Sequence, residues 1–204
     1  MLALGWALAA APGVVRAGAQ AYEPLSASVQ AALHKSVADH VTPFLAFDTE
    51  AEARRWLAAM STRLARRMPD RLQREEFLVT VHYEAKRAGL DPQMVLALIQ
   101  VESNFRKYAV SRAGARGYMQ VMPFWVKLIG ANDHNLFHLR INLRYGCVIM
   151  RHYLDIERGD LYRALGRYNG SLGKPEYPMM VERAWKRDWL YKIPATETAR
   201  GPAF

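Results

Sequence analysis

The residue whose position is chemically most informative is Glu102, because it stands where an apolar side chain is expected. Val95, Leu98 and Ile99 mark the apolar stripe of a helix. Glu102 falls at the next position of that stripe. A carboxylate buried there costs free energy unless it is paired or kept neutral by a raised pKa, and a raised pKa is what a general acid needs near neutral pH. Periodicity alone leaves a second interpretation open, in which the stripe ends at Ile99 and Glu102 is solvated or ion-paired.

The segment that follows Glu102 is basic and contains glycine. Between Ser103 and Asn132 there is no Asp or Glu, while there are five basic residues. Gly114 and Gly117 let a backbone approach a ligand or fold tightly, and Gln120 offers both a donor and an acceptor. An acid beside such a loop suits an anionic, extended ligand, although a basic surface loop with turn glycines has the same composition. The five basic residues are Arg106, Lys107, Arg112, Arg116 and Lys127.

The elements that must position Glu102 are predicted to be helices, since apolar residues recur with helical period and alternating runs are scarce. Asp91 can cap the helix that carries Glu102, and Pro92 suits its first position. Residues 110–124 are expected to be irregular. The other predicted helices cover residues 26–40, a segment capped by Asp48 or Thr49 that ends near Arg67, and residues 70–88, 142–158, 161–168 and 177–191.

Composition narrows the kind of protein. The chain has 204 residues, 51% hydrophobic residues and a formal net charge of +9, which favours a polyanionic partner such as nucleic acid, an anionic membrane surface or an acidic wall polymer. Its one cysteine, Cys147, can build neither a disulfide framework nor a metal cluster and is expected to be a small buried hydrophobe. His134 and His138 are four residues apart in a polar loop without Cys or Glu ligands. We therefore expect no metal and no cofactor.

The N-terminal 21 residues look like a secretory signal peptide. An apolar run leads to small-x-small sites that predict cleavage near Ala19 or Ala21. No Lys or Arg precedes the run, so a buried N-terminal helix is the alternative. The run is too short to span a bilayer, and no cysteine near the cleavage site indicates a lipid anchor. We expect an exported protein of the periplasm or cell envelope, without a membrane segment after signal cleavage.

Three short motifs then resemble one family. Glu102-Ser103-Asn104-Phe105, the run from Gly114 to Pro123, and Tyr168-Asn169 are similar, in order, to the signatures of the soluble lytic transglycosylase catalytic domain, which has the goose-type lysozyme fold. The resemblance covers roughly residues 76–175. It implies a mostly α, lysozyme-like domain with an N-terminal helical extension. The expected organisation is a signal peptide at 1–21, an extension at 22–70, a catalytic domain at 71–193 and a mobile tail at 194–204.

The resemblance also implies roles for single residues. Glu102 would be the catalytic acid and then the base. Phe105 and Met119 are better interpreted as core residues, and Asn142 and Gly146 fall where the family has residues that open a helix. Arg167 departs from the family, which has a small residue before the tyrosine. The substrate-binding residues that it implies are Ser111 against the muramoyl residue, Gln120 and Met122 along the glycan cleft, Tyr168 with its hydroxyl toward the catalytic carboxyl, and its companion Asn169.

The function implied is cleavage of the β-1,4 bond between N-acetylmuramic acid and N-acetylglucosamine in peptidoglycan, with formation of a 1,6-anhydro sugar. No acidic residue follows Glu102 for thirty residues, which favours a one-carboxylate mechanism over the usual two. A goose-type hydrolase that recruits a distant Asp is the first alternative. A non-catalytic peptidoglycan-binding subunit of an envelope machine is another. A nucleic-acid-binding module is disfavoured by the signal peptide, and an envelope partner could dock through residues 22–70.

Overall fold

The computed structural model describes residues 20–38 and 41–192. Within these ranges the chain is helical, and β-structure is limited to two isolated bridges, Val110–Arg116 and Arg116–Val121. The predicted mostly α fold class is confirmed. Nearly all of the predicted signal peptide and the whole of the predicted tail at 194–204 lie outside the described residues.

Each of the first three helices begins after a polar residue whose side chain caps it. Thr49 accepts from the Glu52 amide while the Glu52 side chain accepts from the Thr49 amide, which is a complete capping box. Ser26 and Asp70 each cap their helix with a single contact, in which the side chain accepts from a backbone N–H three residues later. The helices are α1 at Ala27–Val37, α2 at Glu50–Leu64 and α3 at Arg71–Arg87.

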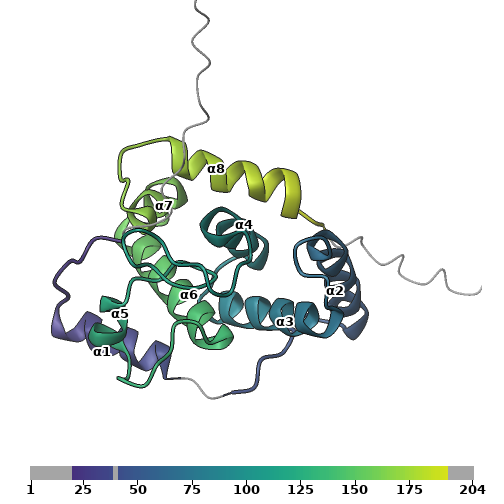
Figure 1. Cartoon of the computed structure of the whole chain (residues 1–204), viewed down its shortest axis with the longest axis horizontal. Helices are drawn as coiled ribbons and strands as arrows, with labels where there is room; N and C mark the ends of the chain where they lie inside the picture. Colours follow the sequence, from purple (N-terminus) through teal and green to yellow (C-terminus); the bar gives the residue numbers. More distant parts are fainter. Residues whose placement is uncertain (1–19, 39–40, 193–204) are drawn as a thin grey trace, which may run out of the picture.

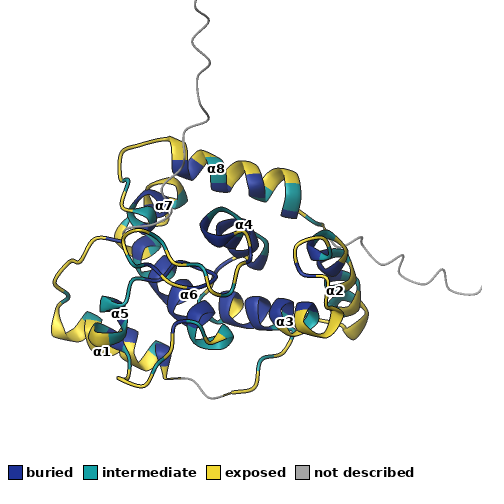
Figure 2. Ribbon diagram, viewed as in Figure 1, coloured by how far each residue is buried: buried dark blue, intermediate teal, exposed yellow. Residues whose placement is uncertain are grey.

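The fourth helix, α4 at Pro92–Ser103, is the centre of the molecule. Asp91 caps it through the Gln93 and Met94 amides, and Pro92 occupies its first turn as expected. α3 and α8 (Glu176–Ala184) pack against it (Figure 1), as does a π-helical turn at Trp185–Trp189, and most of its residues are buried (Figure 2). Gln93, Gln100 and Val101 are half-buried, and the other nine residues of α4 are buried. An acid at one of those nine positions is held away from water.

The second half of the chain surrounds α4 with shorter elements. These are α5 at Phe124–Ile129, α6 at Leu139–Ile156, α7 at Leu161–Asn169, α8 at Glu176–Ala184 and a π-helical turn, η1, at Trp185–Trp189. The sequence did not predict α5, whose six residues are too few to show a period. α6 begins before Asn142, so the prediction that this residue opens the helix is wrong. Its side chain instead accepts from the Met119 amide and donates to Arg116 O and Leu136 O.

The N-terminal extension shares one hydrophobic core with the rest of the chain. Trp56, Met60 and Leu64 of α2 are buried in the cluster that contains Phe77 and Ile99. α1 packs against α5 and α6 at the opposite side of the molecule (Figure 1). The boundary near residue 70 stays a prediction. None of the described helices combines the length and apolarity that a bilayer crossing requires.

Candidate active site

Glu102 lies in the last turn of α4 and is only 4% exposed. The prediction that it continues the buried stripe is confirmed, which excludes the solvated alternative. Tyr177, at the start of α8, donates its hydroxyl to Glu102 Oε1. Oε2 has no hydrogen-bond partner, and no Lys or Arg of the described ranges forms an ion pair with this carboxyl. The group is thus buried with one neutral donor and no counter-charge.

Burial without a counter-charge determines the acidity of the Glu102 carboxyl. Burial raises the pKa of Glu102 to about 8, while the Tyr177 hydroxyl acts in the opposite direction by stabilising the ionised form. At neutral pH the carboxyl therefore holds a proton that it can deliver. Once that proton has left, Tyr177 still donates to the carboxylate. The site is arranged for a group that first gives a proton and then takes one.

Tyr168 lies beside this pair but serves a different contact. It is fully buried on α7, and its hydroxyl donates to Met119 O at 2.7 Å. Burial and then the nearby Glu102 raise the pKa of Tyr168 well above its ordinary value. The prediction that the Tyr168 hydroxyl faces the Glu102 carboxyl is therefore wrong, because the hydroxyl that contacts this carboxyl belongs to Tyr177. The sequence analysis missed Tyr177, since a tyrosine in the first turn of an expected helix carries no local signal of its role.

The loop from Phe105 to Pro123 reaches the site through tight backbone turns. Gly117 has φ +76°, and a Cβ at this position would lie 2.6 Å from Leu136 O, so only glycine fits. The side chain of Gln120 is buried and donates to Ala109 O and to Gly117 O. The amide nitrogen of this predicted cleft residue therefore holds the loop together.

Two of the remaining predicted substrate residues, Ser111 and Met122, belong to the same loop, and the third, Asn169, ends α7. Ser111 is half-buried, and its Oγ accepts from the Ala115 amide at 3.1 Å. Met122 is half-buried, and its backbone N–H donates to a side chain from the N-terminal segment. Asn169 donates to Ser171 Oγ, and its role as the companion of Tyr168 stays a prediction. Phe105 and Met119 are core residues, as predicted.

The basic residues of the loop lie over aromatic rings or against backbone. Lys107 Nζ is 5.3 Å from the centre of the Tyr108 ring, and the Arg116 guanidinium carbon is 6.0 Å from that of Phe137. Arg106 donates to Ser103 O, at the end of the helix that carries Glu102. None of these cations pairs with Glu102, so they can attract an anionic ligand and leave the raised pKa of the acid intact.

Other candidate sites do not gather catalytic groups. The described residues contain no cluster of three or more His, Cys, Asp or Glu suited to a metal ion. His134 shares a hydrogen bond with the Tyr145 hydroxyl at 2.7 Å, which explains this histidine structurally. Cys147 is fully buried, as predicted, and burial raises its pKa well above the ordinary value, so it is a poor nucleophile.

Comparison with known proteins places these residues in one domain. Residues 80–178 match the sequence model of the Transglycosylase SLT domain, and this range contains Glu102, Tyr177 and every predicted substrate residue. This stretch of the chain, just under half of it, is therefore similar to the transglycosylase SLT domain.

Individual relatives cover only part of the chain. The membrane-bound lytic murein transglycosylase C of Actinobacillus pleuropneumoniae serotype 5b is 48% identical over 48 residues, which is 24% of this chain and 13% of the relative. The transglycosylase of Enterobacteria phage PRD1 is 31% identical over 98 residues, or 48% of this chain and 36% of the relative. A solved structure of an inactive mutant of the lytic transglycosylase Slt from Pseudomonas aeruginosa aligns with 53% of this chain and 18% of its own, at 28% identity and a TM-score of 0.41.

Proposed function

We propose that this protein is a peptidoglycan lytic transglycosylase in which Glu102 acts as acid and then as base. The observation that carries the proposal is the buried Glu102 carboxyl, which accepts a hydrogen bond from a tyrosine hydroxyl and pairs with no cation. This residue lies in the stretch that matches the SLT domain. A carboxyl of raised pKa that faces neutral groups is suited to protonating a leaving oxygen. The activity, the substrate and the outcome of the reaction are all part of the proposal.

In the first step, Glu102 gives its proton to the oxygen that joins N-acetylmuramic acid to N-acetylglucosamine. The bond from that oxygen to the muramoyl anomeric carbon breaks, and N-acetylglucosamine leaves with a hydroxyl group. The positive charge on the muramoyl ring is relieved by the carbonyl oxygen of its own acetamido group, which is the substrate-assisted exception among glycosidases. Tyr177 donates to the carboxylate that is left behind.

In the second step, the Glu102 carboxylate removes the proton of the muramoyl C6 hydroxyl. The C6 oxygen attacks the anomeric carbon and displaces the acetamido oxygen, so a 1,6-anhydro sugar forms and Glu102 is again protonated. Because the attacking oxygen is tethered to the ring, its effective concentration greatly exceeds that of a free water molecule. No water is consumed.

The surroundings of Glu102 favour this outcome over hydrolysis of the goose type. A two-carboxylate enzyme needs a second acid that activates water or attacks the sugar. In the described ranges no hydrogen bond connects Glu102 to another carboxyl group. Asp155, one of the distant candidates, pairs with Arg151 on the same helix. A one-carboxylate mechanism therefore fits the site better.

The test is digestion of purified peptidoglycan with mass spectrometry of the products. We expect 1,6-anhydro products, each lighter by one water than the hydrolytic product. Glu102→Gln should lower the rate about a thousandfold, within the range of general acid catalysis, while the variant stays folded and still binds peptidoglycan. Hydrolytic products would identify a lysozyme, and no soluble product at all would identify a non-catalytic wall-binding subunit.

Action on peptidoglycan also requires a location outside the cytoplasm. The predicted signal peptide supports export to the periplasm or cell envelope, and an envelope partner that docks on residues 22–70 stays a prediction. N-terminal sequencing of protein from the native host should begin at Gln20 or Tyr22. A cytoplasmic protein that still begins at Met1 would contradict export.

A further inference from the structure

A short segment before α1 is fastened to the loop beside the candidate active site. The Gln20 side chain is only 3% exposed, and its carboxamide makes two hydrogen bonds to one stretch of backbone. Nε2 donates to Gln120 O at 3.1 Å, and Oε1 accepts from the Met122 N–H at 3.0 Å. Because the donor and the acceptor of one amide are both engaged, this contact fixes how the segment is oriented and aligned on the loop backbone.

The next residues add two further contacts. The ring of Tyr22 meets that of Phe124, at the start of α5, edge-on with 5.6 Å between the centres. Glu23 pairs with Arg167 of α7 at 3.1 Å. We call residues 20–23 the N-terminal strap. Its contacts fall on three separate pieces of the domain, so the strap crosses from the loop to the helix that carries Tyr168.

The stretch of backbone that Gln20 holds is in direct contact with the surroundings of Glu102. Ser103, the residue after the acid, donates its hydroxyl to Tyr118 O at 2.7 Å. Tyr168, which lies close enough for the charge of Glu102 to act on it, donates to Met119 O. The carbonyl and the N–H that Gln20 occupies follow one and three residues after Met119. The strap therefore sits at the candidate active site.

The two backbone groups have no alternative partner in the fold. In the described part of the chain, the only hydrogen bond to Gln120 O and the only one from the Met122 N–H are those to Gln20. Buried backbone groups without a partner cost free energy, so this pair needs a ligand whenever the strap is away. A ligand for one carbonyl and one N–H must offer a donor and an acceptor, as an amide does.

We propose that the N-terminal strap is a built-in competitor of the substrate, in which the Gln20 carboxamide occupies backbone groups that an acetamido group of the glycan would use. The proposal rests on the proposed function, since it is the peptidoglycan strand that supplies acetamido groups. It also requires that the predicted signal peptide is cut after Ala19, because a cut after Ala21 would remove Gln20. The strap then has to lift before the strand binds, and its three contacts set how often it does. The apparent affinity for the glycan falls as the fraction of molecules with the strap in place rises.

The test compares binding of two sugar tetramers in a Glu102→Gln background, in which no turnover occurs. One is the tetramer of N-acetylglucosamine, and the other is the tetramer of glucosamine, which lacks acetamido groups. Gln20→Ala should tighten binding of the acetylated tetramer about fivefold, since one or two hydrogen bonds no longer compete. It should leave the affinity for the deacetylated tetramer unchanged. Calorimetry or fluorescence titration measures both.

Gln30→Ala is the matched control. Gln30 is also a glutamine near the N-terminus whose carboxamide donates to a backbone carbonyl, Leu128 O at 2.6 Å, but this contact fastens α1 to α5. It should change neither affinity. If Gln20→Ala weakens or leaves unchanged the binding of the acetylated tetramer, the strap supports the loop and the inference is wrong.

An equal gain with both tetramers would also overturn the inference, because it would mean that the strap only blocks access. Digestion of peptidoglycan by the otherwise unaltered protein separates this result from the proposed function. Anhydro products together with no effect of Gln20→Ala refute the strap alone. A lack of any product refutes the proposed function.

Discussion

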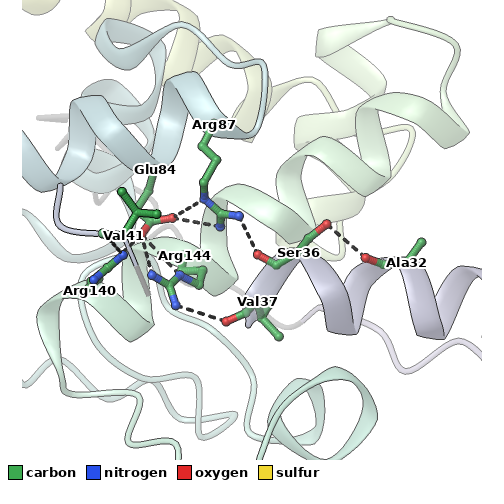
Figure 3. Close-up of polar contacts among 8 residues, drawn as sticks. All are labelled: Ala32, Ser36, Val37, Val41, Glu84, Arg87, Arg140 and Arg144. Carbon is green, nitrogen blue, oxygen red and sulfur yellow. Dashed lines mark hydrogen bonds and ion pairs between the residues drawn. The ribbon is translucent and has the colours of Figure 1, made fainter. Parts of the chain in front are cut away.

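Glu84 and Glu102 are both buried, but their carboxyl groups have opposite surroundings. Glu84, on α3, has no exposed side-chain surface and accepts hydrogen bonds from three guanidinium groups, those of Arg87, Arg140 and Arg144 (Figure 3). Glu102, on α4, accepts from one tyrosine hydroxyl and from no cation of the described chain. Burial is thus common to both sites, and the neighbours differ.

The difference separates a structural acid from a reactive one. The arginines around Glu84 also donate to the end of α1, Arg87 to Ser36 O at 2.7 Å and Arg144 to Val37 O at 3.1 Å, so this cluster ties the extension to the domain (Figure 3). The Glu84 carboxyl is occupied by these ion pairs. The Glu102 carboxyl has neutral neighbours, and burial raises its pKa to about 8. Charge around the acid therefore tells more about role than burial does.

The strongest test of this difference is to replace each of the two acids by glutamine in turn. Glu84→Gln should lower the free energy of unfolding by about 3–5 kcal/mol at pH 7, since it leaves buried guanidinium groups without their counter-charge. Urea unfolding followed by circular dichroism measures the loss. A change below about 1 kcal/mol would show that the arginines do not depend on Glu84.

Glu102→Gln should instead raise the free energy of unfolding. The folded pKa, about 8, lies above the unfolded one, so the wild-type protein loses stability as pH rises from about 4.5 to about 8 and the unfolded chain releases a proton that the folded chain keeps. Gln carries no such proton. Glu102→Gln should therefore stabilise the protein by about 3 kcal/mol at pH 7 and by nearly nothing at pH 4. A pH-independent difference would contradict the raised pKa.

A finer test separates the two tyrosines near Glu102. Tyr177→Phe removes the one donor to the carboxyl, so the pKa of Glu102 should rise further and the loss of activity at alkaline pH should move to higher pH. The rate should fall about tenfold, because the carboxylate left after proton transfer loses its hydrogen bond. The pH dependence of peptidoglycan digestion measures both effects.

Tyr168→Phe is the matched control for that variant. Its hydroxyl donates to Met119 O, so its loss should lower stability and leave the position of the alkaline limb unchanged. If the two variants shift the limb equally, Tyr177 has no special relation to the acid.

The smallest expected effect concerns two exposed cations of the loop that follows Glu102 in the sequence. Replacing Arg112 and Arg116 together by Gln should weaken peptidoglycan binding a few-fold at low salt and flatten its salt dependence, since exposed charges are screened over about 8 Å at physiological ionic strength. Turnover at saturating substrate should change far less than in Glu102→Gln. Binding measured across a salt series decides this, and a salt-independent affinity would leave the positive charge without a role in capture.

Local features of the fold could be predicted from the sequence because their partners are close along the chain. The cap of α2, predicted at Asp48 or Thr49 and found at Thr49, and the Asp91-Pro92 start of α4 involve residues at most three apart. The burial of Glu102 followed from a stripe on its own helix. These predictions are confirmed.

The contacts that complete the site could not be predicted in this way. Tyr177 is 75 residues from Glu102, and Gln20 is 100 residues from Gln120. No periodicity or cap relates positions so far apart, and which tyrosine meets the acid is decided by the packing of α8 on α4. Asn142 shows the same limit. It looks like a helix opener locally, whereas its partners are set by the loop packed against it.

The way in which α1 is fastened has a consequence for how this extension can diverge. Four hydrogen bonds among the described residues join α1 to the domain, and in each the acceptor is a backbone carbonyl group. The pairs are Gln30 to Leu128, His34 to Ile129, Arg87 to Ser36 and Arg144 to Val37. Every amino acid carries that carbonyl, so the two contacts which the domain makes to α1 do not depend on the side chains there. Apart from the buried Leu33 and Val37, most of the helix surface is free to acquire new sequences, and with them new specificities, while it stays docked in one place.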